Sequence, residues 1–126
     1  MSEYSKNPAK PMDVFRVRRV KYIGEQDGPA EREFKEELIG LLSHKSTIRR
    51  AYLARVSHGQ TDPEGVALCL CTGIGPDDRL LVHQAGAIFA SMFNAQEHLD
   101  VLFLKRHEEI ELARVCRPFF DRETSQ

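Results

Sequence analysis

Apolar residues recur along the chain at two spacings, one typical of helices and the other typical of strands. Two stretches are apolar at every third or fourth position, which is the spacing of a helix with one buried face. We expect the first helix at about residues 29–44 and the second within residues 77–93. Pro29 suits the first helical position, and Asp77 or Asp78 is the expected N-cap of the second helix. The two apolar stripes are Phe34, Leu38, Leu41 and Leu42, and then Leu81, Ala85, Ile88, Phe89, Met92 and Phe93.

Four other stretches show the alternation, or the continuous apolar run, of β-strands. They cover about residues 14–23, 47–57, 66–75 and 99–104. Turn residues between the second and third stretches predict a hairpin. In the second strand, alternation predicts one apolar face made of Ile48, Tyr52, Ala54 and Val56.

In the first of these strands, the apolar residues do not all fall on the same face. Phe15 and Val17 fall on one face, whereas Val20 and Tyr22 fall on the other. A single regular strand cannot bury all four side chains on one side of a sheet. We therefore expect a β-bulge near residues 18–19.

The elements follow the order β-α-β-β-α-β, and residues 106–116 predict a short closing helix. This order matches the ferredoxin-like, split βαβ pattern of an α+β fold, a small sheet with two amphipathic helices on one face. The strands at 66–75 and 99–104 are apolar on both faces, so the second face needs a cover. The candidates are the terminal segment, a second subunit and a ligand. Prolines and polar residues predict a flexible tail over residues 1–13, and residues 14–126 are expected to form a single domain.

Composition indicates a soluble globular protein of the cytoplasm. The chain has 126 residues, 41% hydrophobic and 29% charged, with a net charge of −1. This charge favours neither nucleic acid nor an anionic membrane. The polar N-terminus lacks the apolar region of a signal peptide, and three cysteines cannot all pair within one chain. Free thiols of this kind are expected in a reducing compartment.

Cys69 and Cys71 are the residues most suggestive of chemistry, because they lie two positions apart. A structural zinc site normally supplies four ligands, and Cys116 is the only other thiol. A reactive redox pair prefers an exposed, electropositive setting, whereas this strand is apolar. We therefore expect the cysteines to be core residues and expect no metal or cofactor.

The remaining polar residues do not assemble into a recognisable catalytic motif. The run 107–109 (His-Glu-Glu) is either an acid–base cluster or a charged helix face, and we favour the face. Gly73 and Gly75 precede a helix but lack the Lys-Ser/Thr of a phosphate loop, and Ser57 lies outside a nucleophile elbow. The five histidines are expected at solvated or capping positions: His44, His58, His83, His98 and His107. We expect no catalytic residue and no enzyme activity.

A basic segment opens the chain. Residues 1–21 hold six basic and two acidic residues, a net charge of +4. Basic residues beside Phe15 and Tyr22 on a sheet would suit RNA. Arg16, Arg18 and Arg19 equally suit an edge strand protected by charge, which we favour.

The run YIGEQDGPAEREFKEELIGLLSHKSTIRRAYLARV, followed by a hairpin, LDVLFL and a final RPFF, resembles the C-terminal domain of the enhanced serine sensitivity proteins, SseB. The features that carry this resemblance are Gly24, Pro29, and the runs 51–53 (Ala-Tyr-Leu), 99–101 (Leu-Asp-Val) and 118–120 (Pro-Phe-Phe). It covers about residues 20–120. Family members often end in Pro-Phe-Tyr. This chain has Phe120 in place of the tyrosine and therefore lacks its hydroxyl group. The resemblance implies the fold and a bacterial cytoplasmic location, and it implies no catalytic residues.

Together these observations predict a module that acts by protein–protein interaction, as a homodimer or as a regulatory or adaptor subunit. The alternative is a domain that senses a small ligand such as an amino acid, and RNA binding is less favoured. No membrane association is expected. A deep pocket with convergent polar groups would favour the ligand, and an apolar patch rimmed by charge would favour a protein. Tyr52, Phe119 and Phe120 are expected to anchor the core.

Overall fold

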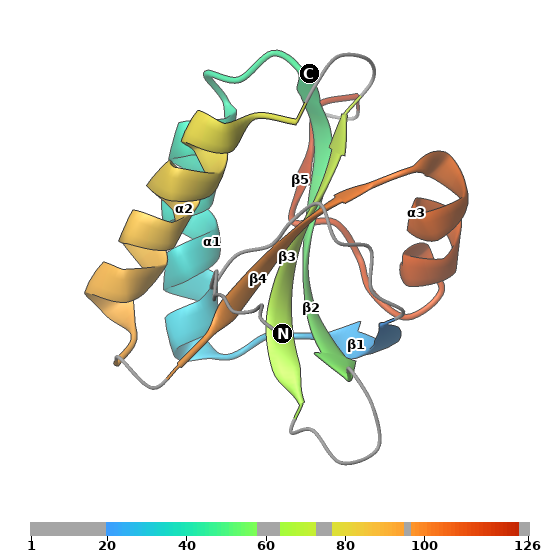
Figure 1. Ribbon diagram of the computed structural model, residues 1–126, viewed down its shortest axis with the longest axis horizontal. Helices are drawn as coiled ribbons and strands as arrows, with labels where there is room; N and C mark the ends of the chain where they lie inside the picture. The colour runs from blue at the N-terminus through green and yellow to red at the C-terminus, as the bar shows by residue number, and fades with distance from the viewer. Residues whose placement is uncertain (1–19, 58–63, 73–76, 95–96, 124–126) are drawn as a thin grey trace, which may run out of the picture.

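The computed structural model describes residues 20–57, 64–72, 77–94 and 97–123. It shows an α+β fold in the predicted element order, with a closing helix and one further short strand (Figure 1). The elements are β1 (Lys21–Glu25), α1 (Pro29–Leu42), β2 (Ile48–Ser57), β3 (Gly65–Thr72), α2 (Arg79–Met92), β4 (Leu99–Leu104), α3 (Arg106–Ala113) and β5 (Phe120–Asp121). The predicted hairpin is confirmed, because β2 and β3 pair antiparallel over nearly their whole length.

The strands of the sheet lie in chain order, β1-β2-β3-β4. The β1–β2 and β2–β3 pairs are antiparallel, and the β3–β4 pair, joined through α2, is parallel. A split βαβ unit would place another strand between the parallel pair, whereas here β3 and β4 are direct neighbours. β5 pairs with the outer edge of β2 beyond the end of β1, so β1 and β5 share that edge.

The sheet has a core on each face. Helices α1 and α2 cover one face, and α3 covers the other (Figure 1). The first core is built around Phe34, Leu38, Leu53, Leu68, Leu70, Leu81, Phe89 and Val101. The second is built around Tyr52, Ala54, Val56, Ala67, Cys69, Cys71, Leu112 and Cys116. The terminal segment, one of the three candidates, therefore covers the second face of the sheet.

Two details of the strands depart from the predicted pattern. Ile48 was expected on the face of Tyr52, but a register shift between Ile48 and Arg50 turns it into the first core, with Leu53. That part of the prediction is wrong because alternation holds only while the strand is regular. In β1 the register shifts between Tyr22 and Gly24, whereas the bulge expected near residues 18–19 lies outside the described residues.

The segment after α3 returns to the sheet and fastens α1 to it. The backbone N–H groups of Phe119 and Arg122 donate to the carbonyls of Ala51 and Arg49, at 2.9 and 2.8 Å. The Arg122 guanidinium donates at 2.9 Å to three carbonyls at the end of α1 and the start of β2, those of Leu42, Lys45 and Ile48. The last carbonyls of a helix lack partners within the helix, so Arg122 acts as a C-terminal cap for α1.

The aromatic anchors differ in depth. Tyr52 is 3% exposed, as expected of a core residue. Phe119 and Phe120 are only half-buried and pack against the margin of the first core. The terminal aromatics therefore border the core rather than fill it. Among the described residues, no helix is long and apolar enough to cross a membrane.

Candidate functional site

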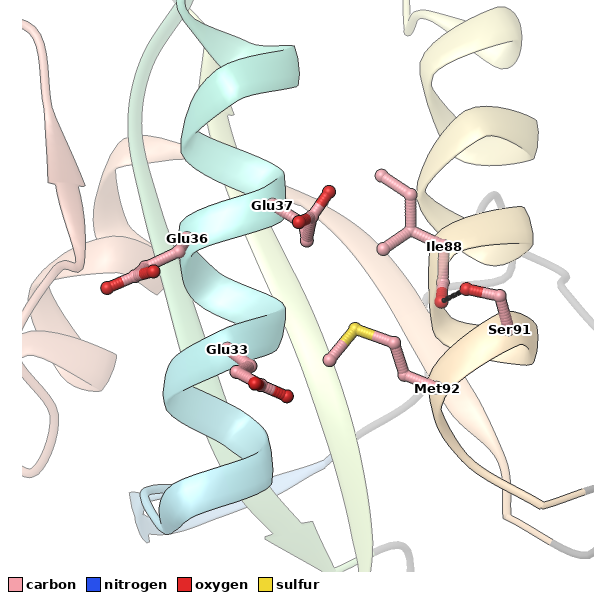
Figure 2. Close-up of a pocket in the computed structure, with 6 residues that line it drawn as sticks. All are labelled: Glu33, Glu36, Glu37, Ile88, Ser91 and Met92. Carbon is pink, nitrogen blue, oxygen red and sulfur yellow. Dashed lines mark hydrogen bonds between the residues drawn. The ribbon is translucent and has the colours of Figure 1, made fainter.

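A groove of about 460 Å³ runs between α1 and α2 (Figure 2). Its lining residues are Glu33, Glu36, Glu37, Ile88, Ser91 and Met92. The α1 wall is therefore acidic, and the α2 wall is mostly apolar. Figure 2 shows Glu37 pointing from α1 toward Ile88, and Met92 extending from α2 toward α1.

Helical spacing explains this arrangement. On α1 the stripe of Phe34, Leu38 and Leu42 is fully buried. Glu33 and Glu37, each one position before a stripe residue, stand beside the stripe and four residues apart. On α2, Ile88 and Met92 flank the buried Phe89 in the same way and remain half-buried.

Aromatic contacts hold the two helices together at the groove. The Phe34 ring meets the rings of Phe89 and Phe93 edge-on, with centroids 5.4 and 5.8 Å away. Phe89 and Phe93 also stack on each other at 4.6 Å. Such pairs add roughly 0.5–1.5 kcal/mol each beyond their buried area, so they stabilise the packing of α1 against α2.

The groove carries uncompensated negative charge. In the part of the chain that the structure describes, Glu33, Glu36 and Glu37 have no ion-pair partner, and no cation lines the groove. The Ser91 hydroxyl donates to the carbonyl of Ile88 at 2.8 Å, so its proton is already engaged. The site therefore suits a partner that brings positive charge and apolar side chains together.

A second polar cluster lies on the opposite face of the sheet, beneath α3. The Glu109 carboxylate is 6% exposed and accepts from Arg50 Nε and Nη2, at 2.5 and 3.2 Å. It also accepts from the Tyr52 hydroxyl at 2.8 Å. The hydrogen bonds from Arg50 hold the pKa of Glu109 below its ordinary value, while burial and this carboxylate raise the pKa of Tyr52. Glu109 belongs to α3, and its donors Arg50 and Tyr52 belong to β2, so these hydrogen bonds attach α3 to the sheet.

The interpretation of 107–109 as a charged helix face is therefore incomplete. His107 is exposed, and Glu108 accepts from the backbone N–H of Lys105 at 2.8 Å. Glu109 is instead buried, and the sequence reading missed it. The sequence feature that could have indicated its burial is Arg50. Arg50 lies on the same side of β2 as Tyr52, and a charged side chain beside a buried one needs a partner of opposite charge.

The three cysteines are core residues, as predicted. Cys69 is fully buried, and Cys71 and Cys116 are each 4% exposed. Burial raises the pKa of Cys69, raises that of Cys71 to about 12 and raises that of Cys116 to about 11. The thiols therefore remain protonated and unreactive near neutral pH.

The other sequence candidates are scattered. His44, His83, His98 and His107 are exposed, and His98 Nε2 lies 2.9 Å from Asp100; His58 lies outside the described residues. Ser57 is the last residue of β2, and residues 58–63 after it lie outside the described part of the chain. Within the described ranges no three His, Cys, Asp or Glu side chains gather as metal ligands do.

Helix α2 begins at an aspartate side chain. Asp78 is its N-cap, as expected, and accepts from the backbone N–H of Leu81 at 2.9 Å. Asp78 also lies 3.6 Å from the ammonium of Lys45. Gly73 and Gly75 are outside the described residues, as are Phe15, Arg16, Arg18 and Arg19 of the basic segment. The basic segment and the glycines are therefore not tested, and the phosphate-loop and RNA interpretations remain the less favoured hypotheses.

Comparison with known proteins gives one match. A family model described as the SseB protein C-terminal domain matches residues 23–122. No curated protein and no solved structure matches the chain. The matched range begins within β1 and ends just after β5, so it includes both faces of the sheet and the groove between α1 and α2. The predicted resemblance is confirmed, and the chain belongs to the family of SseB protein C-terminal domains.

Proposed function

We propose that this chain is a non-catalytic module of the bacterial cytoplasm that acts by protein–protein interaction, as a regulatory or adaptor subunit. The observation that carries the proposal is the groove between α1 and α2, with one acidic and one apolar wall. The occupant that fits is a cationic, amphipathic segment of a partner protein. Three buried free thiols agree with a reducing compartment.

The two walls match the two sides of a basic amphipathic helix. Lysine or arginine side chains of such a helix would face Glu33 and Glu37, and its apolar side chains would contact Ile88 and Met92. Docking of a helix in a groove uses this division between apolar anchors and charged flanks. The flexible thioether of Met92 adapts to anchors of different shape.

The same groove is less suited to the alternative ligands. A free amino acid carries an α-carboxylate, which would meet three glutamates and no lining cation. RNA phosphates would be repelled for the same reason. Charge therefore favours a cationic partner over an amino acid or a nucleic acid at this site.

The acidic wall also works against the stability of the free protein. Glu33 and Glu37 lie four residues apart on α1, where like charges destabilise a helix by about 0.2–0.5 kcal/mol per pair. A binding role explains a charge pattern that folding by itself disfavours.

Isothermal titration calorimetry with a synthetic helical peptide of lysine and leucine tests the proposal. The double variant Glu33→Lys/Glu37→Lys should weaken peptide binding at least about tenfold, because each replaced contact changes from attraction to repulsion. Its control, Glu64→Lys/Glu111→Lys, makes the same change of charge at exposed positions away from the groove and should alter binding less than about twofold.

Two outcomes would overturn the proposal. Equal loss in both variants would mean that net charge, rather than the groove, attracts the peptide. Saturable binding of a free amino acid, sensitive to the groove variant, would favour the sensing function instead. A peptide in which glutamate replaces lysine should not bind and serves as the ligand control.

A further inference from the structure

The strand β4 forms one edge of the sheet. Among the described residues it pairs only with β3, in a regular parallel register over all six of its residues. No other described strand lies along its outer side, and an edge strand of this length can accept another strand.

The opposite edge of the sheet is built differently. There β1 is interrupted by a register shift between Tyr22 and Gly24, and β5 is only two residues long. Irregular and short edge strands are ordinary means of preventing edge-to-edge pairing. β4 has neither feature, and its sequence, LDVLFL, contains no proline.

The side chains of β4 would favour an added strand on both faces. Leu102 lies at the margin of the core beneath α3, and Phe103 lies at the margin of the core beneath α1 and α2. Both are half-buried, so each has surface left to cover. A neighbouring strand would remove apolar area from water on each side of the sheet.

The charges at the two ends of β4 are complementary. Glu97 precedes the strand, and Lys105 and Arg106 follow it; all three are exposed and have no ion-pair partner in the described part of the chain. In an antiparallel pair of two identical strands, the start of one lies beside the end of the other. Glu97 of each copy would then lie beside the basic end of the second copy.

We propose that the chain forms a twofold homodimer in which β4 of one copy pairs antiparallel with β4 of the other. With the twofold axis at Leu102 and perpendicular to the sheet, Val101 of one copy faces Phe103 of the other. The two sheets become one continuous sheet, and both copies keep α1 and α2 on the same face. The groove stays open, so this proposal is independent of the partner proposed for it.

Sedimentation velocity over a dilution series, from about 1 to 100 μM, tests the dimer. The mass should rise from the 14.4 kDa monomer toward twice that value. The variant Lys105→Glu/Arg106→Glu should stay monomeric, because it sets acid against Glu97 in both contacts. Acidic residues suit the first turn of α3, so this variant should keep its fold.

A charge-swap rescue separates pairing from unfolding. Glu97→Lys on its own should also dissociate the dimer, and the triple variant with both ends reversed should restore it. The control Arg114→Glu/Arg117→Glu makes an equal change of charge at exposed positions after α3 and should leave the dimer intact. Hydrogen exchange should show the β4 amides protected in the dimer and exchanging faster in the monomeric variant.

The result that overturns the proposal is a constant monomer mass up to 100 μM. It also fails if a dimer forms but resists both charge reversals, or if the triple variant is not rescued. Unchanged β4 exchange on dissociation would place the interface elsewhere and equally refute it. Peptide titrations on the monomeric variant keep these outcomes separate from a failure of the groove.

Discussion

Replacing Glu109 by glutamine should destabilise the protein by about 3 kcal/mol, because this carboxylate is the buried link between α3 and the sheet. It accepts two hydrogen bonds from Arg50 and one from Tyr52. Glutamine has nearly the same shape but no charge, and its amide N–H₂ would face the Arg50 donors. The change therefore removes the electrostatic link and leaves the packing of α3 almost untouched.

The magnitude follows from what remains around Arg50. Breaking a buried ion pair by removing one partner costs about 3–5 kcal/mol. Arg50 Nη1 keeps the Glu123 carboxylate at 3.0 Å and Asp121 at 3.9 Å, so its charge is not left alone. We therefore expect the lower end of this range. For a domain of this size the loss corresponds to a fall in Tm of roughly 10–15 °C.

The loss should also depend on pH. Arg50 lowers the pKa of Glu109 in the folded protein below its value of about 4.5 in the unfolded chain. A lowered carboxyl pKa contributes stability that is fully present above pH 4.5 and is lost as the pH falls through the folded value. The stability difference between wild type and Glu109→Gln should therefore be full at pH 7 and shrink below about pH 4.5.

Urea unfolding at pH 7 and at pH 3.5, followed by circular dichroism, measures both effects. The matched control is Glu111→Gln, an exposed residue of the same helix, which should change the free energy of unfolding by less than about 0.5 kcal/mol. The reasoning is refuted if Glu109→Gln is no more destabilising than this control, or if its effect is the same at both pH values.

Three other changes test separate parts of the fold by the same unfolding assay. Arg122→Gln should lower the free energy of unfolding by about 2 kcal/mol, because three carbonyls near the end of α1 lose a charged donor. The control Arg117→Gln, at an exposed position, should leave the free energy of unfolding almost unchanged. Replacing Cys69 and Cys71 together by valine should change stability by about 1–2 kcal/mol through packing, and mass spectrometry should find the same metal content before and after. Gln84→Leu should stabilise the protein by about 1 kcal/mol, because the Gln84 Oε1 atom is buried without a hydrogen-bond partner in the described part of the chain; an unchanged midpoint would mean that this oxygen is satisfied.

Local spacing was enough to predict the three helices and the strands β1 to β4, but not the two-residue strand β5. The helical stripe of α1 follows from backbone geometry, which repeats every 3.6 residues in a helix. The unpaired N–H groups at the start of α2 predicted Asp77 or Asp78 as its N-cap, and the structure selects Asp78. In β3, predicted to be apolar on both faces, Leu68 packs in the first core and its neighbour Cys69 in the second, as the period of two of a strand requires. The resemblance of residues 20–120 to the SseB C-terminal domain was likewise visible in short sequence motifs, and the family match confirmed it.

Spacing failed where the chain departs from a regular period or where distant segments meet. The face of Ile48 depends on a register shift within β2, which the alternation of letters does not reveal. The pairing of Arg50 with Glu109 joins residues 59 positions apart, and it exists because α3 crosses the second face of the sheet. The charge of Glu109 suggested solvent, and only a donor on another element makes its burial favourable.

The groove between α1 and α2 and the position of β4 at the edge of the sheet also depend on contacts between distant segments. The periodicity of α2 predicted Ile88 as part of the apolar stripe, whereas the structure leaves it half-buried at the groove. Only the packing of α1 and α2 against one face of the sheet brings Ile88 and Glu37 to a common groove. Likewise, LDVLFL was recognisable as a buried strand, whereas its place at the edge comes from the order of strands in the sheet. Periodicity is a property of neighbouring residues, and a surface is made by residues that folding brings together from distant parts of the chain.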